Sequence, residues 1–147
     1  MKLLILNGPN LNLLGRREPD IYGKEDYPAL CHYIEACANA AGIAVKIVQS
    51  NHEGVLVDEI QKAFGIFDGI VINPAAYTHT SIAILDALKA VALPAVEVHL
   101  SNPQERESFR YISYAGMACL TTFAGEGFLG YAKSIAYLAD YLNQKNS

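Results

Sequence analysis

Cysteine is scarce in this sequence, which has Cys31, Cys37 and Cys119 and no tryptophan. The cysteine count is odd and no pair has C-x-x-C spacing, so the sequence predicts neither a disulfide framework nor a thiolate zinc site. The histidines also lack the H-E-x-x-H spacing of zinc hydrolases. We therefore expect reduced cysteines, no metal site and no other bound cofactor.

Long apolar runs and clusters of basic residues are missing as well. The apolar stretch after Lys2 is shorter than a signal-peptide core and ends at Asn7, and no stretch approaches the roughly 20 residues of a membrane span. With a net charge of -4 and no run of lysine or arginine, the sequence gives no reason to expect nucleic acid or an anionic membrane as a partner. We expect a cytoplasmic protein whose ligands are small neutral or anionic metabolites.

The sequence does contain enough apolar residues for one substantial core. Of its 147 residues, 52% are hydrophobic and 18% are charged, and no linker or low-complexity segment divides residues 1–147. Five apolar runs rich in β-branched residues, at 2–6, 43–49, 69–72, 95–100 and 118–123, alternate with helical patterns. This alternation predicts a single α/β domain in which a doubly wound, flavodoxin-like sheet of five parallel strands lies between two helical layers.

Helix signals lie between these runs. Asp26 is a suitable N-cap with Pro28 in the first turn, and the helix that follows should end at Gly42. We expect a second helix at 55–64 with Leu56, Ile60, Ala63 and Phe64 directed inward, and a third after Thr80 that contains Ile82, Leu85 and Leu88. A short polar helix should begin at Pro103, and a last helix should span 128–142.

The loop after the first strand, residues 7–23, is rich in amide and guanidinium groups and contains one phenol. It starts at the carboxyl end of a strand, where open α/β proteins bind their ligands. Arg17 and Tyr22 are close in sequence there, and a fixed cation lowers a phenol pKa towards that of a usable base. The alternative is a solvated surface loop with a buried tyrosine.

The fourth strand carries ionisable groups. Because side chains alternate along a strand, Glu97, His99 and Ser101 share one face. A carboxylate two residues before a histidine can accept from one ring nitrogen and leave the other for a substrate, which also keeps a protonated histidine available as an acid. The alternative is a buried histidine satisfied by its neighbour, without chemistry.

Polar residues also follow the third strand. Asn73 ends that strand, and His79 precedes Thr80 and Ser81 at the start of a helix. An amide, an imidazole and a helix N-terminus together suit a hydroxylated or carboxylated ligand, although Thr80 or Ser81 alone indicates only a helix cap. Arg110 either forms a surface ion pair or, beside a pocket, holds a carboxylate or an adjacent hydroxyl.

Residues 125–130 match the dinucleotide fingerprint G-x-G-x-x-G. The fingerprint belongs to a βαβ unit with an acidic residue about 20 positions further on, at the end of the next strand, and here a helix follows without such a strand. Close packing of a strand against a helix explains these glycines, so we do not predict a dinucleotide cofactor.

Together these motifs resemble those of the type II 3-dehydroquinate dehydratases. The resemblance rests on residues 7–15, 17–23, 49–54, 73–81 and 97–102, in order and at compatible spacing, and it spans nearly the whole chain. Departures occur at Ala75, at Leu85 and at residues 111–112. They fall outside the positions to which the resemblance gives a chemical role.

This resemblance implies a reversible anti elimination of water from 3-dehydroquinate to 3-dehydroshikimate, in the shikimate pathway of aromatic amino-acid biosynthesis, without a cofactor. Tyr22 would be the base, with its pKa lowered by Arg17, and Asn10 with an ordered water would hold the enolate oxygen. His99, oriented by Glu97, would protonate the departing hydroxyl.

The resemblance also implies the groups that bind the substrate. Its hydroxyls and carboxylate would be held by Asn73, His79, Leu100, Ser101 and Arg110. Asp86 would reach the site from an adjacent subunit, in a homo-oligomer of trimers assembled into a dodecamer.

Two further expectations concern the mechanism. The lysines at 2, 24, 46, 62, 89, 133 and 145 lie outside the strand-end motifs, which argues against an imine intermediate. Residues 13–23 carry two glycines and a proline and are predicted to form a mobile lid over the substrate.

The rival class is a flavodoxin-like module that binds a nucleotide or a protein partner in the same crevice, since fold alone does not fix function. A signalling module of that kind would carry acidic residues after its first strand, where this chain has Asn7 and Asn10.

Overall fold

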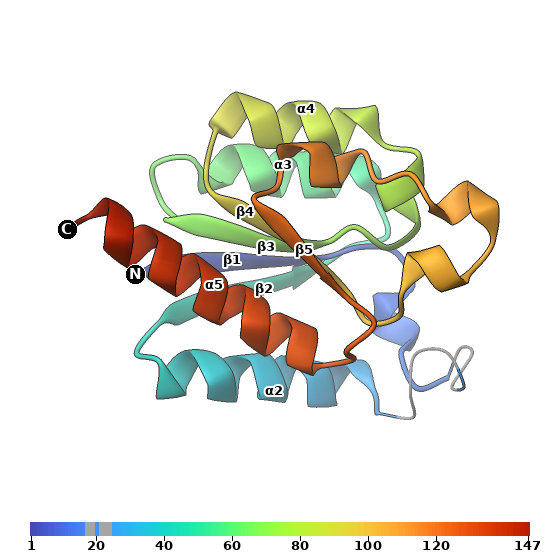
Figure 1. The fold of residues 1–147 in the computed structure, drawn as a ribbon, viewed down its shortest axis with the longest axis horizontal. Helices are drawn as coiled ribbons and strands as arrows, with labels where there is room; N and C mark the ends of the chain where they lie inside the picture. Colours follow the sequence, from blue (N-terminus) through green and yellow to red (C-terminus); the bar gives the residue numbers. More distant parts are fainter. Residues whose placement is uncertain (17–19, 21–24) are drawn as a thin grey trace.

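The structure is a computed structural model that describes residues 1–16, 20 and 25–147. In this part of the chain, five parallel strands form one sheet in the order β2-β1-β3-β4-β5 (Figure 1). The strands are β1 (Lys2–Asn7), β2 (Ala44–Gln49), β3 (Gly69–Asn73), β4 (Ala95–His99) and β5 (Thr121–Ala124). This strand order is that of the flavodoxin-like doubly wound fold, so the predicted fold class is confirmed.

Helices cover both faces of the sheet. In Figure 1, α3 (Glu53–Ala63) and α4 (Ile82–Val91) lie on one face, and α2 (Tyr27–Ala40) and α5 (Leu129–Lys145) lie on the other. Short 3-10 helices are η1 (Leu11–Leu13), η2 (Ala75–His79), η3 (Pro103–Glu105), η4 (Ser108–Arg110) and η5 (Ala115–Ala118). Among the described residues, no helix is long and apolar enough to cross a membrane.

The helix starts follow the local sequence signals. Asp26 caps α2 by accepting a hydrogen bond from the backbone N–H of Ala29 at 3.0 Å, with Pro28 in the first turn. Ser81 caps α4 in the same way through the N–H of Ile84 at 3.0 Å. The capping interpretation of Ser81 is therefore confirmed.

Side chains of β1 point alternately to the two faces of the sheet and so contribute to two separate halves of the core. Leu3 and Ile5 are buried with the residues of α2 and α5, whereas Leu4 and Leu6 are buried with those of α3 and α4. All four are fully buried, and each such side chain contributes roughly 1.5–3 kcal/mol through removal from water. The two halves hold the strands in register, so the carboxyl ends of β1, β3 and β4 meet at one edge.

Some predicted boundaries were wrong. Phe64 is 69% exposed rather than buried, because α3 ends at Ala63 and Phe64 has a non-helical ψ of 124°. The last strand begins at Thr121, which is the first residue of β5 that pairs with β4, and Ala115–Ala118 form η5 instead of a strand start. Smaller differences occur at other boundaries: for example, β2 begins at Ala44, β4 ends at His99, α3 begins at Glu53, and α5 runs from Leu129 to Lys145.

Candidate active site

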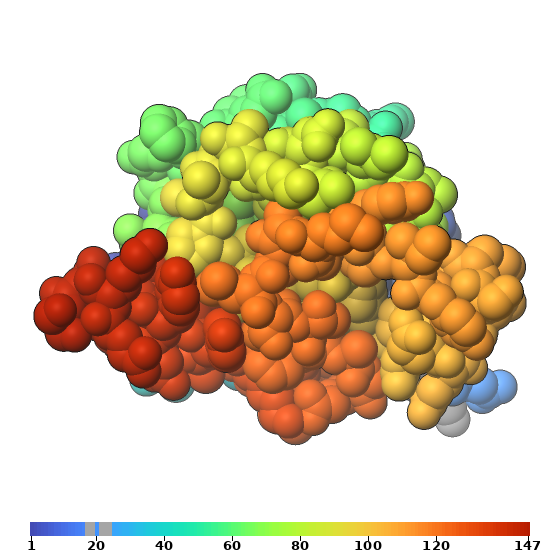
Figure 2. Space-filling view, turned by 45° about the horizontal axis from the view of Figure 1, so that its top comes forward, coloured from blue at the N-terminus to red at the C-terminus, as the bar shows by residue number. Residues whose placement is uncertain are grey.

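A cavity lies at the carboxyl edge of the sheet. It is lined by Pro9, Asn10, Leu11, Leu14, Asn73, Ala75, Ala76, His79, His99, Leu100, Ser101, Pro103, Arg106 and Arg110. Figure 2 shows the segment around residues 100–112 at the end of the molecule opposite the C-terminal end of α5. This is the edge at which doubly wound proteins bind ligands.

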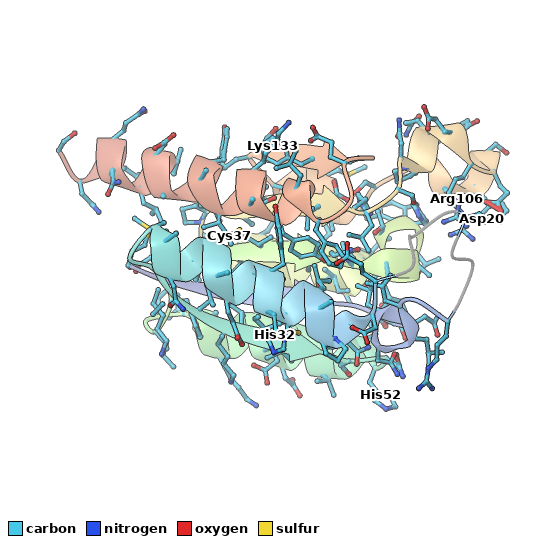
Figure 3. All side chains as sticks on the ribbon, turned by 90° about the horizontal axis from the view of Figure 1, so that it is seen from below. Asp20, His32, Cys37, His52, Arg106 and Lys133 are labelled. Atoms are coloured by element: carbon cyan, nitrogen blue, oxygen red, sulfur yellow. The ribbon has the colours of Figure 1, made fainter. Side chains whose placement is uncertain are left out.

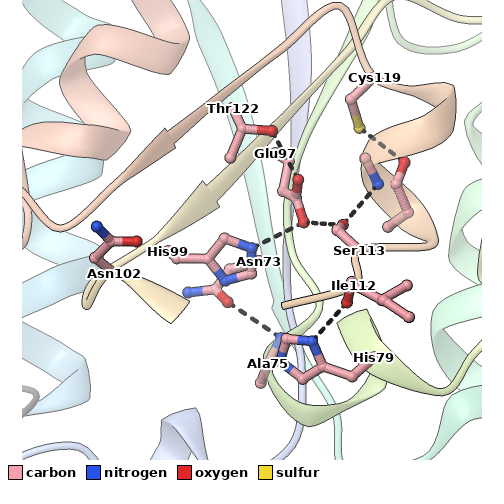
Figure 4. Close-up of polar contacts among 12 residues, drawn as sticks. Asn73, Ala75, His79, Glu97, His99, Asn102, Ile112, Ser113, Cys119 and Thr122 are labelled. Atoms are coloured by element: carbon pink, nitrogen blue, oxygen red, sulfur yellow. Dashed lines mark hydrogen bonds and ion pairs between the residues drawn. The ribbon is translucent and has the colours of Figure 1, made fainter. Parts of the chain in front are cut away.

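His99 is held by Glu97 from inside the sheet. Nε2 of His99 lies 2.8 Å from Oε2 of Glu97, and the two residues are 8% and 1% exposed (Figure 4). A carboxylate can only accept, so Nε2 carries the proton and Nδ1 is the ring nitrogen available to a ligand. The predicted pair is confirmed as a hydrogen-bonded unit, and His99 lines the cavity.

Two hydroxyl groups from segments later in the sequence also hydrogen-bond the Glu97 carboxylate. The Ser113 hydroxyl donates to Oε2 at 2.5 Å, and the Thr122 hydroxyl donates to Oε1 at 2.7 Å. Ser113 Oγ itself accepts from the N–H of Gly116 at 2.9 Å, so its proton is directed to the carboxylate. Burial acts to raise the pKa of Glu97, but the hydrogen bonds and the charge of His99 outweigh it and hold the pKa below its usual value. Glu97 is therefore ionised at neutral pH.

His79 is oriented by the backbone. Its Nδ1 lies 2.8 Å from the carbonyl oxygen of Ile112, and a carbonyl requires a donor, so Nδ1 is protonated. Burial is the main cause that lowers the pKa of His79, and it outweighs the hydrogen bond to Ile112. His79 therefore offers a neutral ring, with Nε2 as an acceptor, to the cavity that it lines.

Two asparagines also line the cavity: Asn73 is the last residue of β3, and Asn10 lies at the start of η1, in the loop after β1. Asn73 accepts a hydrogen bond from the N–H of Ala75 at 3.1 Å and is 4% exposed. Asn10 has a left-handed backbone with φ of 70°, and its N–H donates to Oδ1 of Asn51 at 3.0 Å. Both side chains belong to residues that line the cavity.

Arginines line the cavity from the loop after β4. Arg110 Nε forms an ion pair with Glu107 at 2.6 Å, and its side chain is 18% exposed. The sequence left a surface ion pair and a pocket position as alternatives for Arg110. The structure shows both, because Arg110 pairs with Glu107 and also lines the cavity.

Arg106 is a lining residue that sequence reasoning missed. Figure 3 shows it at this end of the molecule, whereas His32 and Cys37 lie along α2. Its position one short helix after Ser101 was the available signal.

The structure gathers most of the predicted site residues. Lining the cavity are Asn10, Asn73, His79, His99, Leu100, Ser101 and Arg110, and Glu97 lies directly behind His99. Asp86 is exposed on α4 and is not among the described residues that line the cavity. Arg17 and Tyr22, and most of the predicted lid, lie outside the described residues.

No three histidine, cysteine, aspartate or glutamate side chains lie close enough to hold a metal ion within the described part of the chain. Cys31, Cys37 and Cys119 are free thiols.

Comparison with known proteins identifies the family. The family model for dehydroquinase class II matches residues 1–139. The chain belongs to the dehydroquinase class II family. Among curated proteins, the 3-dehydroquinate dehydratase of Corynebacterium glutamicum (strain R) is 50% identical over 139 residues, which is 95% of this chain and 96% of the relative. The 3-dehydroquinate dehydratase of Clostridium acetobutylicum is 47% identical over 144 residues, which is 98% of this chain and all of the relative.

Solved structures of dehydroquinases have the same fold. The crystal structure of a type II dehydroquinase from Butyrivibrio crossotus superposes with a TM-score of 0.93 at 49% identity, over 95% of this chain and 97% of that one. The type II dehydroquinase from Propionibacterium acnes gives a TM-score of 0.91 at 40% identity, over 95% and 96% of the two chains. The family that the five sequence motifs indicated is therefore confirmed.

Proposed function

We propose that this protein is a 3-dehydroquinate dehydratase that eliminates water from 3-dehydroquinate to give 3-dehydroshikimate. Membership of the dehydroquinase class II family and 50% identity to a curated 3-dehydroquinate dehydratase support this activity. The structural observation that carries it is the His99–Glu97 hydrogen bond of 2.8 Å beside a cavity lined by amide, imidazole and guanidinium groups. Such a cavity suits a polyhydroxylated anion better than the flat ring of a nucleotide cofactor.

His99 is the proposed general acid. An elimination needs a proton for the departing hydroxyl, and an imidazole held by a buried carboxylate can deliver it at neutral pH. Glu97 orients the ring and stabilises the imidazolium without touching the substrate. The other ring nitrogen, Nδ1, would be the donor to the leaving group.

Tyr22 is the proposed base and Arg17 the cation that lowers its pKa. These roles come from the family resemblance, because both residues lie outside the described part of the chain. The proton removed is α to a ketone, so the base needs matching stabilisation of the enolate. Asn10, whose backbone N–H donates to Asn51, lines the cavity and would hold the enolate oxygen together with an ordered water.

The substrate would be held by the remaining lining residues. Nε2 of His79 can accept from a hydroxyl, and Asn73 and Ser101 can each donate and accept. Arg110 commits Nε to Glu107, so its Nη groups are the part that would meet a carboxylate or hydroxyl. The backbone at Leu100, where β4 has just ended, would supply further hydrogen bonds.

We also propose a homo-oligomer in which Asp86 acts in the site of a neighbouring subunit. Its exposed place on α4, outside the cavity of its own chain, is compatible with that role. Large apolar side chains close in sequence to site residues are exposed, as expected for a surface that contacts another subunit. Examples are Ile82 at 55%, Phe109 at 67% and Ile112 at 55%. Sedimentation analysis would test the predicted dodecamer, and a cytoplasmic location and a single domain over residues 1–147 stay predictions.

The direct test is to add 3-dehydroquinate to the purified protein and follow ultraviolet absorbance, because loss of water conjugates the ketone with a new double bond. Tyr22→Phe should abolish most of the turnover while ligand binding stays measurable. Near-normal turnover by this variant would assign the base to another residue. Borohydride with substrate should leave the enzyme active, and covalent trapping on a lysine would instead indicate an imine mechanism.

A rival activity makes a different prediction. A flavodoxin-like module that binds a flavin would be yellow when purified, and a partner-binding module would show no turnover of 3-dehydroquinate. Either result would refute the proposed activity.

A further inference from the structure

A tyrosine from α5 bridges the ends of two neighbouring strands. Asn7 and Asn73 are the last residues of β1 and β3 and are partners in the strand register. Nδ2 of Asn73 lies 3.0 Å from the hydroxyl of Tyr131, which lies 2.6 Å from Oδ1 of Asn7. Asn7 and Tyr131 are fully buried, and Asn73 is 4% exposed.

The direction of these hydrogen bonds follows from one backbone group. The N–H of Ala75 can only donate, so the side-chain group of Asn73 that faces it must be the oxygen. Asn73 therefore presents Nδ2 to Tyr131, and the phenol, having accepted, gives its own proton to Asn7. Burial raises the pKa of Tyr131, so the phenol keeps this proton at neutral pH.

The orientation of Asn73 is thus fixed from two sides, by Tyr131 and by Ala75. One N–H of Nδ2 and one lone pair of Oδ1 are left uncommitted by these two bonds. Because Asn73 lines the cavity, these are the groups that a ligand can meet. Without the phenol, the amide would lose the contact that holds Nδ2 away from Ala75.

The glycines at 125, 127 and 130, just before Tyr131, explain how the phenol reaches the sheet. A Cβ at Gly130 would lie 3.0 Å from Cγ2 of Val98, which is closer than packed side chains normally come. Gly127 has φ of +59°, which favours glycine. The motif that resembled a dinucleotide fingerprint therefore serves the close approach of α5 to β4, and Tyr131 follows directly.

We propose that Tyr131 is a positioning residue for substrate binding, which fixes the Asn73 amide so that it can hydrogen-bond a hydroxyl of the cyclic substrate. This inference rests on the proposed dehydratase activity. Tyr131 acts through Asn73 and does not touch the substrate. Its chemical requirement is a neutral hydroxyl that accepts from one amide and donates to the other.

The test is the kinetics of Tyr131→Phe with 3-dehydroquinate. The hydroxyl supports a contact made equally in the ground state and the transition state, so KM should rise about three- to tenfold while kcat stays within about twofold. Tyr137→Phe is the matched control, because Tyr137 lies on the same helix, is 38% exposed and packs its ring on Phe123. This control should leave both constants unchanged.

A double-variant comparison separates positioning from general loosening of the fold. If Tyr131 acts through Asn73, adding Tyr131→Phe to Asn73→Ala should leave KM unchanged relative to Asn73→Ala alone. A further rise in KM in that background, or an unchanged KM in Tyr131→Phe itself, would overturn the proposal.

If circular dichroism shows that Tyr131→Phe does not fold, a second variant tests the proposal. Tyr131→Phe leaves the acceptor of Asn7 without a donor, and Asn7→Leu with Tyr131→Phe removes both groups. The double variant should show the same rise in KM, and a KM equal to that of the wild type would refute the role of Tyr131. Absence of turnover by the wild-type protein would instead refute the proposed function.

Discussion

His99 turns Nε2 towards Oε2 of Glu97 at 2.8 Å, and this contact decides which ring nitrogen is left for the cavity. Glu97 is itself fixed by hydroxyls from Ser113 and Thr122, so the carboxylate cannot rotate without breaking those bonds. The imidazole is consequently oriented from within the sheet. A proton donor held in this way needs little reorganisation when the leaving group departs.

Replacing Glu97 with glutamine should lower activity sharply. The variant removes the charge that stabilises the imidazolium and turns an amide N–H towards groups that only donate here, so we expect kcat to fall about 100-fold. The pH profile of kcat should change as well, because His99 loses its anionic hydrogen-bond partner. Steady-state kinetics between pH 5 and 9 check this. Glu35→Gln, at an exposed position on α2, is the control, and an equal loss in that variant would contradict the prediction.

The same carboxyl should make stability depend on acid pH. The folded pKa of Glu97 is below the value of about 4.3 for an unfolded glutamate, so the unfolded state binds more protons in the window between them. The contribution is therefore fully present above that value and is lost as pH falls through the folded pKa. Urea unfolding from pH 7 to pH 3 should show a smaller loss for Glu97→Gln than for the wild type. Parallel curves would argue against the shift.

His79 should carry its proton on Nδ1 and stay neutral at pH 7. Its folded pKa is below about 6.5, so the unfolded state protonates first and stability should fall as pH drops below that value. Two-dimensional nitrogen NMR of the imidazole signals would identify the tautomer through the bond to Ile112. His79→Ala should raise KM more than it lowers kcat, and a protonated Nε2 at pH 7 would contradict its proposed acceptor role.

Asn51 should affect turnover, although it is not among the described residues that line the cavity. Its Oδ1 accepts from the N–H of Asn10 and from Nε2 of Gln49, at 3.0 Å and 3.1 Å. Asn51→Ala removes the acceptor that holds the left-handed Asn10, so we expect kcat to fall about tenfold, equivalent to about 1.4 kcal/mol. Asn143→Ala, at an exposed position on α5, is the control. Equal kinetics of the two variants would exclude this support.

Cys119 should react slowly with alkylating agents. Burial is the main cause that raises the pKa of its thiol to about 12, with a smaller contribution from the charge of Glu97. At pH 8 only about 10⁻⁴ of such a thiol is thiolate, and the thiolate is the reactive form. Mass spectrometry after timed iodoacetamide treatment should find Cys119 labelled far more slowly than a free cysteine peptide. Labelling at the rate of the peptide would show that the site opens readily.

Much of the fold was readable because its signals are local. Alternation placed Glu97 and His99 on one face of a strand, and the cap at Asp26 marked the start of α2. Ends of elements were less predictable, since Phe64 extends the apolar pattern of α3 but lies past its last helical residue. Local pattern does not say where the last hydrogen bond of a helix forms.

The sequence by itself determined the family, the strand-helix alternation and most of the polar residues that line the cavity, because these depend on residue type and short spacing. Only the tertiary structure decided which groups support them. Ser113 and Thr122 reach Glu97 from 16 and 25 positions away, and Tyr131 reaches Asn7 from 124 positions away. Such partners are brought together by the packing of helices on the sheet, and no periodicity along the chain encodes that geometry.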